Sequence, residues 1–267
     1  MKPVAFDYAR PAGIGEALEL LSANPDAKIL AGGQTLGPML NLRLAQPALL
    51  VDITRIAELA AVGEDAQSIT IGATVTHAAI EDGRVPDPAS GFLARVASGI
   101  AYRAVRSRGT IGGSLAHADP AADWIACLTA LGAEVLLRGV RGARRLAISA
   151  FVHGAMETDL AHDELLTGIR VPKFSSRARF GYHKICRKTG EFAEAIGVAV
   201  HDPDRNVTRL VASTTAGSPI LLEDATFSPD AAALQGRLMQ AGPNADSYEM
   251  NVRVAALQRA MREARPA

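Results

Sequence analysis

The chain has 267 residues, of which 48% are hydrophobic, so it is long enough for two domains and can bury a sizeable core. Its 28 basic and 28 acidic residues cancel, which gives no indication of binding to nucleic acid or to an anionic membrane. No run of about 18 apolar residues occurs and the first residues lack the apolar core of a signal peptide, so neither a membrane span nor secretion is expected.

The first part of the chain alternates helices and strands. Apolar residues at helical spacing predict a helix from Ile14 to Leu21, which the sequence Asn24-Pro25-Asp26 ends. Residues 28–31 are predicted to form a short strand that runs into Gly32-Gly33. A further helix is expected directly after these glycines, followed by a second strand over residues 48–53. This order is typical of an α/β or α+β fold.

The middle of the chain continues this alternation. Residues 68–72 alternate like a strand, and either Thr74 or Thr76 is expected to cap the helix that follows. The pattern then predicts, in order, a helix over residues 92–105, a stretch of small residues from Gly109 to Pro120, a helix over residues 121–131, and strands over residues 134–138 and 165–171.

The last part of the chain differs in pattern. Residues 173–179 (KFSSRAR) are polar and basic, and we interpret them as a domain boundary. Beyond them the sequence predicts strands over residues 180–185, 197–201 and 207–213, and helices over residues 231–264 with a break at Gly242-Pro243. A small sheet followed by helices is therefore expected.

Two glycine-rich segments could hold a phosphate-bearing ligand. Residues 31–37 (AGGQTLG) follow a strand and precede a helix, and residues 110–114 (TIGGS) precede a helix after a short loop. Backbone N–H groups in such turns form concave anion sites, and Thr35, Thr110 and Ser114 add hydroxyl donors. Neither segment matches the GxGxxG or GxxxxGK[ST] motif, so spacing alone favours ordinary tight turns over a cofactor site.

Four segments in succession resemble the FAD-binding subunits of molybdenum hydroxylases. They are LAGGQTLGPMLNLRLAQPALLVDI, ITIGATVTHAAIED, RSRGTIGGSLAHADPAAD and DELLTGIRVP, of which the run TIGGSLAHADPAAD is the most specific. This group includes the medium subunit of aerobic carbon monoxide dehydrogenase and the flavin domain of xanthine dehydrogenase, and the resemblance covers roughly residues 1–215.

The resemblance implies an α+β fold with two parts. Residues 1–172 would form an FAD-binding domain of two subdomains, of the vanillyl-alcohol-oxidase (PCMH) type. Residues 173–267 would form a small C-terminal domain, with an antiparallel sheet and helices, like that of carbon monoxide dehydrogenase flavoproteins.

The resemblance also implies which residues contact FAD. They are the first loop, Leu30, Ala31, Gly32, Gly33, Gln34, Thr35, Leu36 and Gly37; the second, Gly109, Thr110, Gly112, Gly113 and Ser114; and Ile100, His117, Asp123, Leu166 and Lys184. The Asp123 carboxylate would accept hydrogen bonds from hydroxyl or N–H groups and avoid phosphate, because like charges repel.

Each isolated contact has a plainer interpretation from the residue type alone. Ile100 and Leu166 could be ordinary core residues, and His117 could be a polar group that is satisfied without a ligand. Lys184 could lie on a solvated face, and Asp123 could only cap or brace a helix. The arginines Arg103, Arg106 and Arg108 are expected at the surface or in subunit contacts.

The implied function is electron transfer without catalytic side chains in this chain. FAD would accept electrons from two [2Fe-2S] clusters of a small subunit, which receive them from the molybdenum cofactor of a large, substrate-hydroxylating subunit. Electrons would then leave to NAD⁺, a quinone, a cytochrome or O₂. A dimer of heterotrimers in the cytoplasm is expected. The two cysteines, Cys127 and Cys186, form no CxxC motif, so no metal or iron–sulfur site is expected in this chain.

Two alternatives remain open at this point, a stand-alone flavin oxidase of the vanillyl-alcohol-oxidase fold and a scaffold subunit that has lost FAD. Three positions depart from the family pattern. Ser114 stands where relatives have Asn, residues 216–220 (AGSPI) match a usual Gly/Pro turn loosely, and Tyr248-Glu249 replaces a common Tyr-Arg pair.

Overall fold

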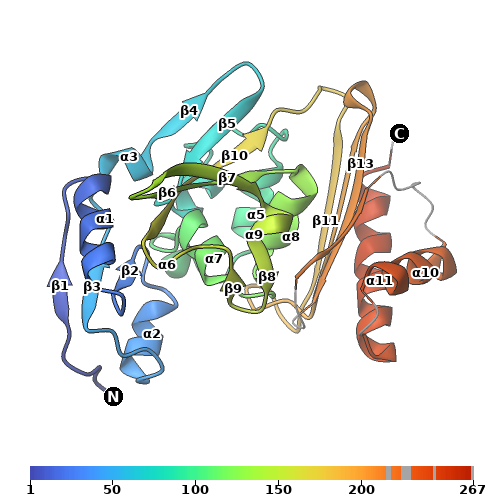
Figure 1. Ribbon diagram of the computed structural model, residues 1–267. Helices are drawn as coiled ribbons and strands as arrows, with labels where there is room; N and C mark the ends of the chain where they lie inside the picture. Colours follow the sequence, from blue (N-terminus) through green and yellow to red (C-terminus); the bar gives the residue numbers. More distant parts are fainter. Residues whose placement is uncertain (215–217, 224–229, 243–244, 266–267) are drawn as a thin grey trace.

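The computed structural model describes residues 1–214, 218–223, 230–242 and 245–265. Of the segment 216–220, Ala216 and Gly217 therefore lie outside the described residues, as does Pro243. The described chain forms three layered parts that follow one another from the N-terminus to the C-terminus (Figure 1).

The N-terminal part is a small parallel sheet with one covering helix. The strands β1 (Asp7–Ala9), β3 (Leu49–Asp52) and β2 (Lys28–Leu30) lie side by side in that order, and both pairs are parallel. Helix α1 (Ile14–Ala23) buries Ile14, Ala17, Leu18 and Leu21, the four residues whose spacing predicted it. Helix α2 (Leu36–Asn41) begins directly after the first glycine segment, as expected.

The central part is built on a five-stranded antiparallel sheet. Its order is β4 (Val62–Glu64), β5 (Ser68–Gly72), β10 (Glu164–Pro172), β6 (Glu134–Gly139) and β7 (Gly142–Ala147). Its helices are α3 (Ala57–Ala60), α4 (His77–Glu81), α5 (Phe92–Ser98), α6 (Arg103–Arg106), α7 (Ile111–His117), α8 (Asp123–Leu131) and α9 (Ile148–Phe151). A two-stranded ribbon, β8 (Val152–Gly154) and β9 (Glu157–Thr158), completes it.

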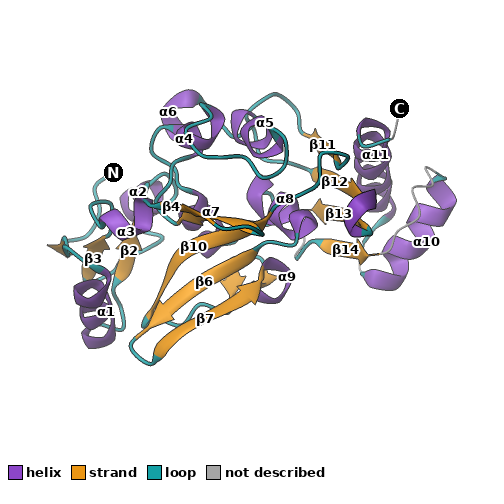
Figure 2. Cartoon of the chain, turned by 90° about the horizontal axis from the view of Figure 1, so that it is seen from above, coloured by secondary structure: helices purple, strands orange, loops and turns teal. Residues whose placement is uncertain are grey.

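The C-terminal part is a four-stranded antiparallel sheet with helices on its outer face. The strands β11 (Arg179–Ile185), β12 (Ala195–Asp202), β13 (Val207–Thr214) and β14 (Ile220–Glu223) follow in chain order, and Pro203–Arg205 turns β12 into β13. Helices α10 (Ala231–Ala241) and α11 (Ser247–Glu263) cover one face, and α5 and α8 lie on the other (Figures 1 and 2). The expected antiparallel sheet with helices is confirmed.

Strand β12 joins the central and C-terminal parts through both of its faces. Ile196, Val198 and Val200 point toward α8 and belong to the largest hydrophobic cluster, together with Trp124, whereas Ala199 faces the smaller cluster beneath α11. This alternation follows the two-residue period of a strand. The largest hydrophobic core therefore extends across residue 173, where the composition predicted a domain boundary.

Helix α11 lies directly on the sheet because two strand residues lack side chains. A Cβ atom at Gly181 would overlap the carbonyl oxygen of Ala260, and one at Gly197 would overlap the backbone of Ala256. The backbones of helix and strand therefore meet at a separation that only glycine permits.

The structure corrects two predicted elements. The sequence predicts one continuous helix over residues 92–105, but the structure has two helices there, α5 and α6, separated by a turn in which Ala101 adopts a positive φ of 42°. The second glycine segment is not a loop before a helix, because Gly112, Gly113 and Ser114 already lie within α7. Of the two candidate caps, Thr76 caps α4 by accepting from the N–H of Ala79 at 3.2 Å.

No helix in the part of the chain that the structure describes is both long and apolar enough to cross a membrane.

Candidate functional site

A cavity of about 540 Å³ lies where the three parts of the chain meet. The first glycine loop and α2 contribute one wall, and α7 and the residues before it contribute a second. Leu165 and Leu166 of β10 line it from the central sheet, while Lys184 of β11 and Phe192 of the following loop line it from the C-terminal part. This volume lies within the range of small-molecule and cofactor sites.

The first glycine loop presents backbone donors that the protein itself leaves unused. None of the N–H groups of Gly32, Gly33, Gln34 and Thr35 donates a hydrogen bond to a described residue of this chain. Gly33 has a φ of +69°, a conformation that glycine adopts without strain. Successive free N–H groups of this kind are a concave site for an anion.

Two glycines bring the walls of the cavity close together. A Cβ atom at Gly32 would overlap the carbonyl oxygen of Arg108 and lie 2.7 Å from Cα of Gly109. A Cβ atom at Gly112 would lie 2.5 Å from Cβ of Ala73. The absence of side chains therefore lets the first loop pack on the segment that leads into α7, and lets α7 pack on the end of β5.

The second glycine segment has a different role from the first, because its N–H groups are already engaged. Thr110 caps α7 by accepting from the N–H of Gly113 at 3.1 Å. The N–H groups of Ile111 and Gly112 donate to the carbonyls of Val75 and Ala73, each at 3.0 Å. The expectation that both segments offer free N–H groups in the same way is therefore wrong for these residues.

A buried ion pair closes the cavity between α8 and β11. The Lys184 ammonium donates to Oδ1 and Oδ2 of Asp123 at 3.0 and 3.2 Å, and the Tyr182 hydroxyl also donates to Asp123. The two charged side chains are only 9% and 6% exposed, so the solvated-face alternative for Lys184 is wrong. Burial raises the pKa of the Asp123 carboxyl, and Lys184 opposes this shift. The plainer interpretation of Asp123 as a residue that braces a helix is thus consistent with the structure, where Asp123 connects α8 to β11 through these buried bonds.

His77 is a buried imidazole at the cavity wall that the sequence did not single out. Its Nδ1 accepts from Nε1 of Trp124 at 3.1 Å, and this fixes the proton of the neutral ring on Nε2. Burial, and to a smaller extent the charge of Arg106, lower the pKa of His77 to about 4. His77 lies in the segment ITIGATVTHAAIED, which resembles the family, but a threonine cap followed by histidine has no spacing of its own that marks a buried ring.

All the residues predicted to contact the cofactor line this cavity except Leu30 and Gly37. The Leu30 side chain supports the loop from behind, with its Cδ1 3.2 Å from where a Cβ of Gly33 would lie. Gly37 contributes to the same loop by donating its N–H to the carbonyl of Gly33 at 2.9 Å. Cavity residues that the sequence missed include His77, Leu160 and Phe192, the last of which is 69% exposed.

The residues present fit a flavin dinucleotide. The free N–H groups of the first loop suit a diphosphate, and the wall formed by Ile100 and Leu166 suits an aromatic ring system. The described residues hold no group of three or more His, Cys, Asp or Glu side chains arranged for a metal ion. Cys127 is buried and Cys186 half-buried, and both thiols are free.

Comparisons with known proteins agree with this site. Residues 4–174 match the family described as the FAD binding domain in molybdopterin dehydrogenase. The chain is 40% identical over 201 residues to the carbon monoxide dehydrogenase medium chain of Hydrogenophaga pseudoflava, which covers 75% of this chain and 70% of that protein. It is 35% identical over 225 residues to the caffeine dehydrogenase subunit beta of Pseudomonas sp. strain CBB1, which covers 82% of this chain and 76% of that protein.

Solved structures show the same relationship over the whole chain. A carbon monoxide dehydrogenase from Hydrogenophaga pseudoflava, which lacks the Mo-pyranopterin moiety of its molybdenum cofactor, superposes with a TM-score of 0.89 at 32% identity, covering 99% of this chain and 98% of that one. The quinoline 2-oxidoreductase of Pseudomonas putida 86 superposes with a TM-score of 0.84 at 28% identity and with the same coverage. The chain therefore belongs to the family of FAD-binding subunits of molybdenum hydroxylases, and it has the α+β, PCMH-type fold of that family.

Proposed function

We propose that this chain is the FAD-binding electron-transfer subunit of a heterotrimeric molybdenum hydroxylase. The observation that carries the proposal is the first glycine loop, whose four consecutive free N–H groups border a cavity of about 540 Å³. A dinucleotide cofactor needs such donors, because this chain has no net charge with which to attract a diphosphate.

In this function the residues of the chain bind FAD and orient its flavin ring. The N–H groups of Gly32 to Thr35 would hold the diphosphate, and Ile100 and Leu166 would pack on the flavin. The same assignment makes Leu30, Ala31, Leu36 and Gly37 part of the first loop, and gives Gly109, Thr110, Gly112, Gly113, Ser114, His117, Asp123 and Lys184 contacts along the opposite walls. Bound FAD supplies the capacity to exchange one electron or two, which suits a junction between iron–sulfur clusters and a two-electron acceptor.

Asp123 and Lys184 are not placed to act as a free acid and base. Their charged groups are paired with each other, and Lys184 also donates to the carbonyl of Gly99 at 3.2 Å. A stand-alone flavin oxidase would need a protonating or deprotonating group over the flavin. Because the two charged groups are already paired with each other, and because the relatives are subunits of larger complexes, electron transfer is favoured over oxidase chemistry.

The names of the relatives, a medium chain and a subunit beta, support partner subunits for this chain. A small subunit with two [2Fe-2S] clusters would deliver the electrons, and a large subunit with the molybdenum cofactor would hydroxylate the substrate. We propose a dimer of heterotrimers that works in the cytoplasm. Within the chain, residues 1–172 would carry the FAD site and residues 173–267 would close it, since Lys184 and Phe192 reach the cavity from the C-terminal part.

Cofactor analysis tests this function directly. The purified chain should contain one FAD per chain, with an absorbance maximum at about 450 nm. Gly33→Val and Gly113→Val should lose FAD, because a branched side chain at a positive φ strains the first loop, and one at Gly113 meets Oγ1 of Thr110. Gly15→Val, at an exposed position with no atom within 4 Å, is the matched control. A colourless wild-type chain that takes up no added FAD would refute the proposal.

A further inference from the structure

The cavity wall contains a sharp turn that separates two helices. Helix α5 ends at Ser98 and α6 begins at Arg103, and between them Ala101 has a φ of 42°. Ile100 and Ala101 of this turn line the cavity. A turn of this kind leaves backbone carbonyls without helical partners, and buried carbonyls need a donor from elsewhere.

Two cationic side chains bind all three successive carbonyls of this turn. Nη1 of Arg106 donates to the carbonyl of Ile100 at 2.8 Å and to that of Ala101 at 3.0 Å. Nζ of Lys184 donates to the carbonyl of Gly99 at 3.2 Å. The donors come from α6 on one side and β11 on the other, so the turn is held from both.

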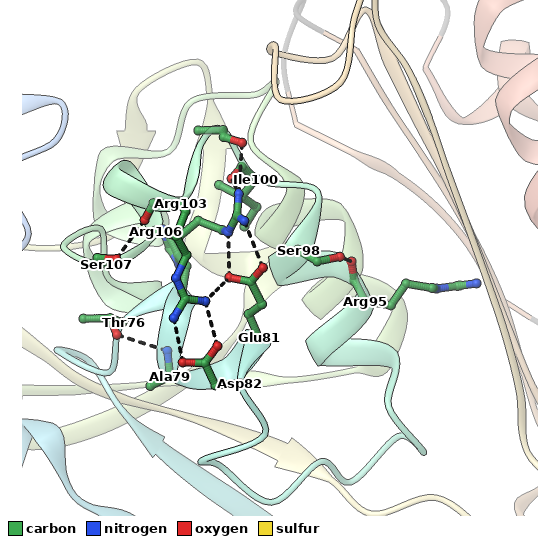
Figure 3. A network of polar contacts seen from close by, with 12 residues as sticks. Thr76, Ala79, Glu81, Asp82, Arg95, Ser98, Ile100, Arg103, Arg106 and Ser107 are labelled. Carbon is green, nitrogen blue, oxygen red and sulfur yellow. Dashed lines mark hydrogen bonds and ion pairs between the residues drawn. The ribbon is translucent and has the colours of Figure 1, made fainter.

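Glu81 of α4 fixes the orientation of the Arg106 guanidinium (Figure 3). Nε and Nη2 of Arg106 donate to the two carboxylate oxygens of Glu81 at 2.8 and 2.9 Å. Such a bidentate pair has one geometry, which leaves Nη1 directed at the turn. The Arg106 side chain is only 11% exposed, so the expected surface role is wrong for this arginine. Its hydrogen bond, together with its charge, also lowers the pKa of the Glu81 carboxyl.

Arg103 shares the Glu81 carboxylate with Arg106, yet its side chain donates no hydrogen bond to the turn among the described residues. It donates to Glu81 at 2.6 Å and to Asp82 at 2.7 and 2.8 Å, and its side chain is 51% exposed. The two arginines thus share the ion pair with Glu81, and they differ in whether they reach the cavity wall. This difference supplies a matched pair of positions.

The far side of the turn leaves it little room to move. A Cβ atom at Gly190, in the loop between β11 and β12, would lie 2.9 Å from the carbonyl oxygen of Ala101. The residues that follow α6 pack on Gly32 of the first glycine loop. A shift of the turn would therefore change the spacing of Ile100 from both the C-terminal part and the diphosphate loop.

We propose that Arg106 is a positioning residue of the FAD site, which holds the Gly99–Ala101 turn, and with it Ile100, at the separation that the cofactor needs. Arg106 itself does not line the cavity among the residues that the structure describes, so it acts through the turn and not by touching FAD. This inference rests on the proposed function, because it takes FAD as the ligand of the cavity.

The test compares Arg106→Gln and Arg106→Lys with Arg103→Gln in the full chain. FAD affinity is measured by titrating the FAD-free protein and following flavin fluorescence, and folding is measured by thermal unfolding of the same FAD-free samples. Arg106→Gln should weaken FAD binding by roughly tenfold or more, because two carbonyl bonds to a charged donor are lost. Arg106→Lys should lie between it and wild type, since a lysine can replace one of these bonds and not the whole set.

Arg103→Gln should bind FAD within about twofold of wild type, since it leaves every bond to the turn intact. The inference is overturned if Arg106→Gln retains wild-type affinity, or if both Gln variants lose affinity in proportion to their loss of thermal stability. If Arg106→Gln does not fold, Arg106→Lys decides the question by the same comparison. A wild-type chain without FAD affinity refutes the proposed function and is distinct from either of these results.

Discussion

Nζ of Lys184 lies 3.0 Å from Oδ1 of Asp123, and this ion pair connects β11 of the C-terminal sheet with the first residue of α8 in the central part. The position of Asp123 in the first turn of a helix favours a negative charge there, since the N-terminus of a helix carries partial positive charge. The pair therefore joins the two halves of the chain beside the cavity.

Removing one partner of this pair should be costly. We expect Lys184→Met to destabilise the protein by about 3–5 kcal/mol, because the Asp123 carboxylate stays buried and, among the described residues, keeps only the Tyr182 hydroxyl as a side-chain donor. Urea unfolding followed by circular dichroism measures this loss.

The double variant Asp123→Asn/Lys184→Met provides the control for that experiment. Neither charge is then left buried alone, so the double variant should lose less stability than the two single variants together. Strictly additive losses would show that the two side chains are not coupled.

The contact between the first glycine loop and the segment before α7 makes a second prediction. Gly32→Ala places a methyl group on the carbonyl oxygen of Arg108, so we expect a loss of about 1–3 kcal/mol together with weaker FAD binding. Gly15→Ala, in α1 and without neighbours within 4 Å, should leave FAD binding intact and raise helix stability by roughly 0.5–1 kcal/mol. Equal FAD affinity in both variants would contradict the close packing at Gly32.

Burial of His77 should make the stability of the protein depend on pH. The pKa of His77 is lowered to about 4, whereas an unfolded histidine has a pKa of about 6.5, so between these values the unfolded chain binds the extra proton. Stability is therefore lost as the pH falls from about 6.5 toward about 4. From pH 7 to pH 5 this histidine should contribute a loss of about 2 kcal/mol.

The His77→Gln variant isolates this contribution from that of other titrating groups. Glutamine can still accept from Nε1 of Trp124 but does not titrate, so the difference between the free energies of unfolding at pH 7 and pH 5 should be smaller in the variant by about 2 kcal/mol. Urea titrations at the two pH values measure it. The same pH dependence in wild type and variant would mean that His77 is not the responsible group.

Much of this architecture could be predicted from the sequence, because local patterns decide it. The apolar spacing from Ile14 to Leu21 reflects the one buried face of α1. The alternation of residues 68–72 correctly predicts β5, whose Ile69 and Ile71 belong to the largest hydrophobic cluster, although the strand is buried on both faces. β12 and β13 form an antiparallel hairpin whose turn ends at Asn206, and this residue has a left-handed conformation with a φ of 51°, which asparagine tolerates.

The features that could not be predicted from the sequence depend on contacts between segments that are distant in the chain. The break after α5 is stabilised by Arg106 and Lys184, which bind its carbonyls from α6 and β11, and no pattern within residues 92–105 indicates this. The glycines of TIGGS predict a turn, because glycine is a poor helix former, yet Gly112 lies within α7 and is required where that helix touches Ala73. His77 depends in the same way on Trp124, 47 positions further along the chain.

Because the largest hydrophobic core extends across residue 173, we expect truncation at this point to disrupt the fold. A fragment of residues 1–172 lacks β12, so α8 would lose Ile196, Val198 and Val200 as packing partners, and Asp123 would lose both Lys184 and Tyr182. Exposing one such apolar side chain costs about 1.5–3 kcal/mol, and three of them approach the whole stability of an ordinary domain. We therefore expect the fragment to lose its near-ultraviolet circular dichroism, to bind a hydrophobic dye and to take up no FAD, while the full chain unfolds cooperatively. A fragment that unfolds cooperatively at the same urea concentration as the full chain, and that binds FAD equally well, would show instead that residues 1–172 fold and function without the sheet that covers them.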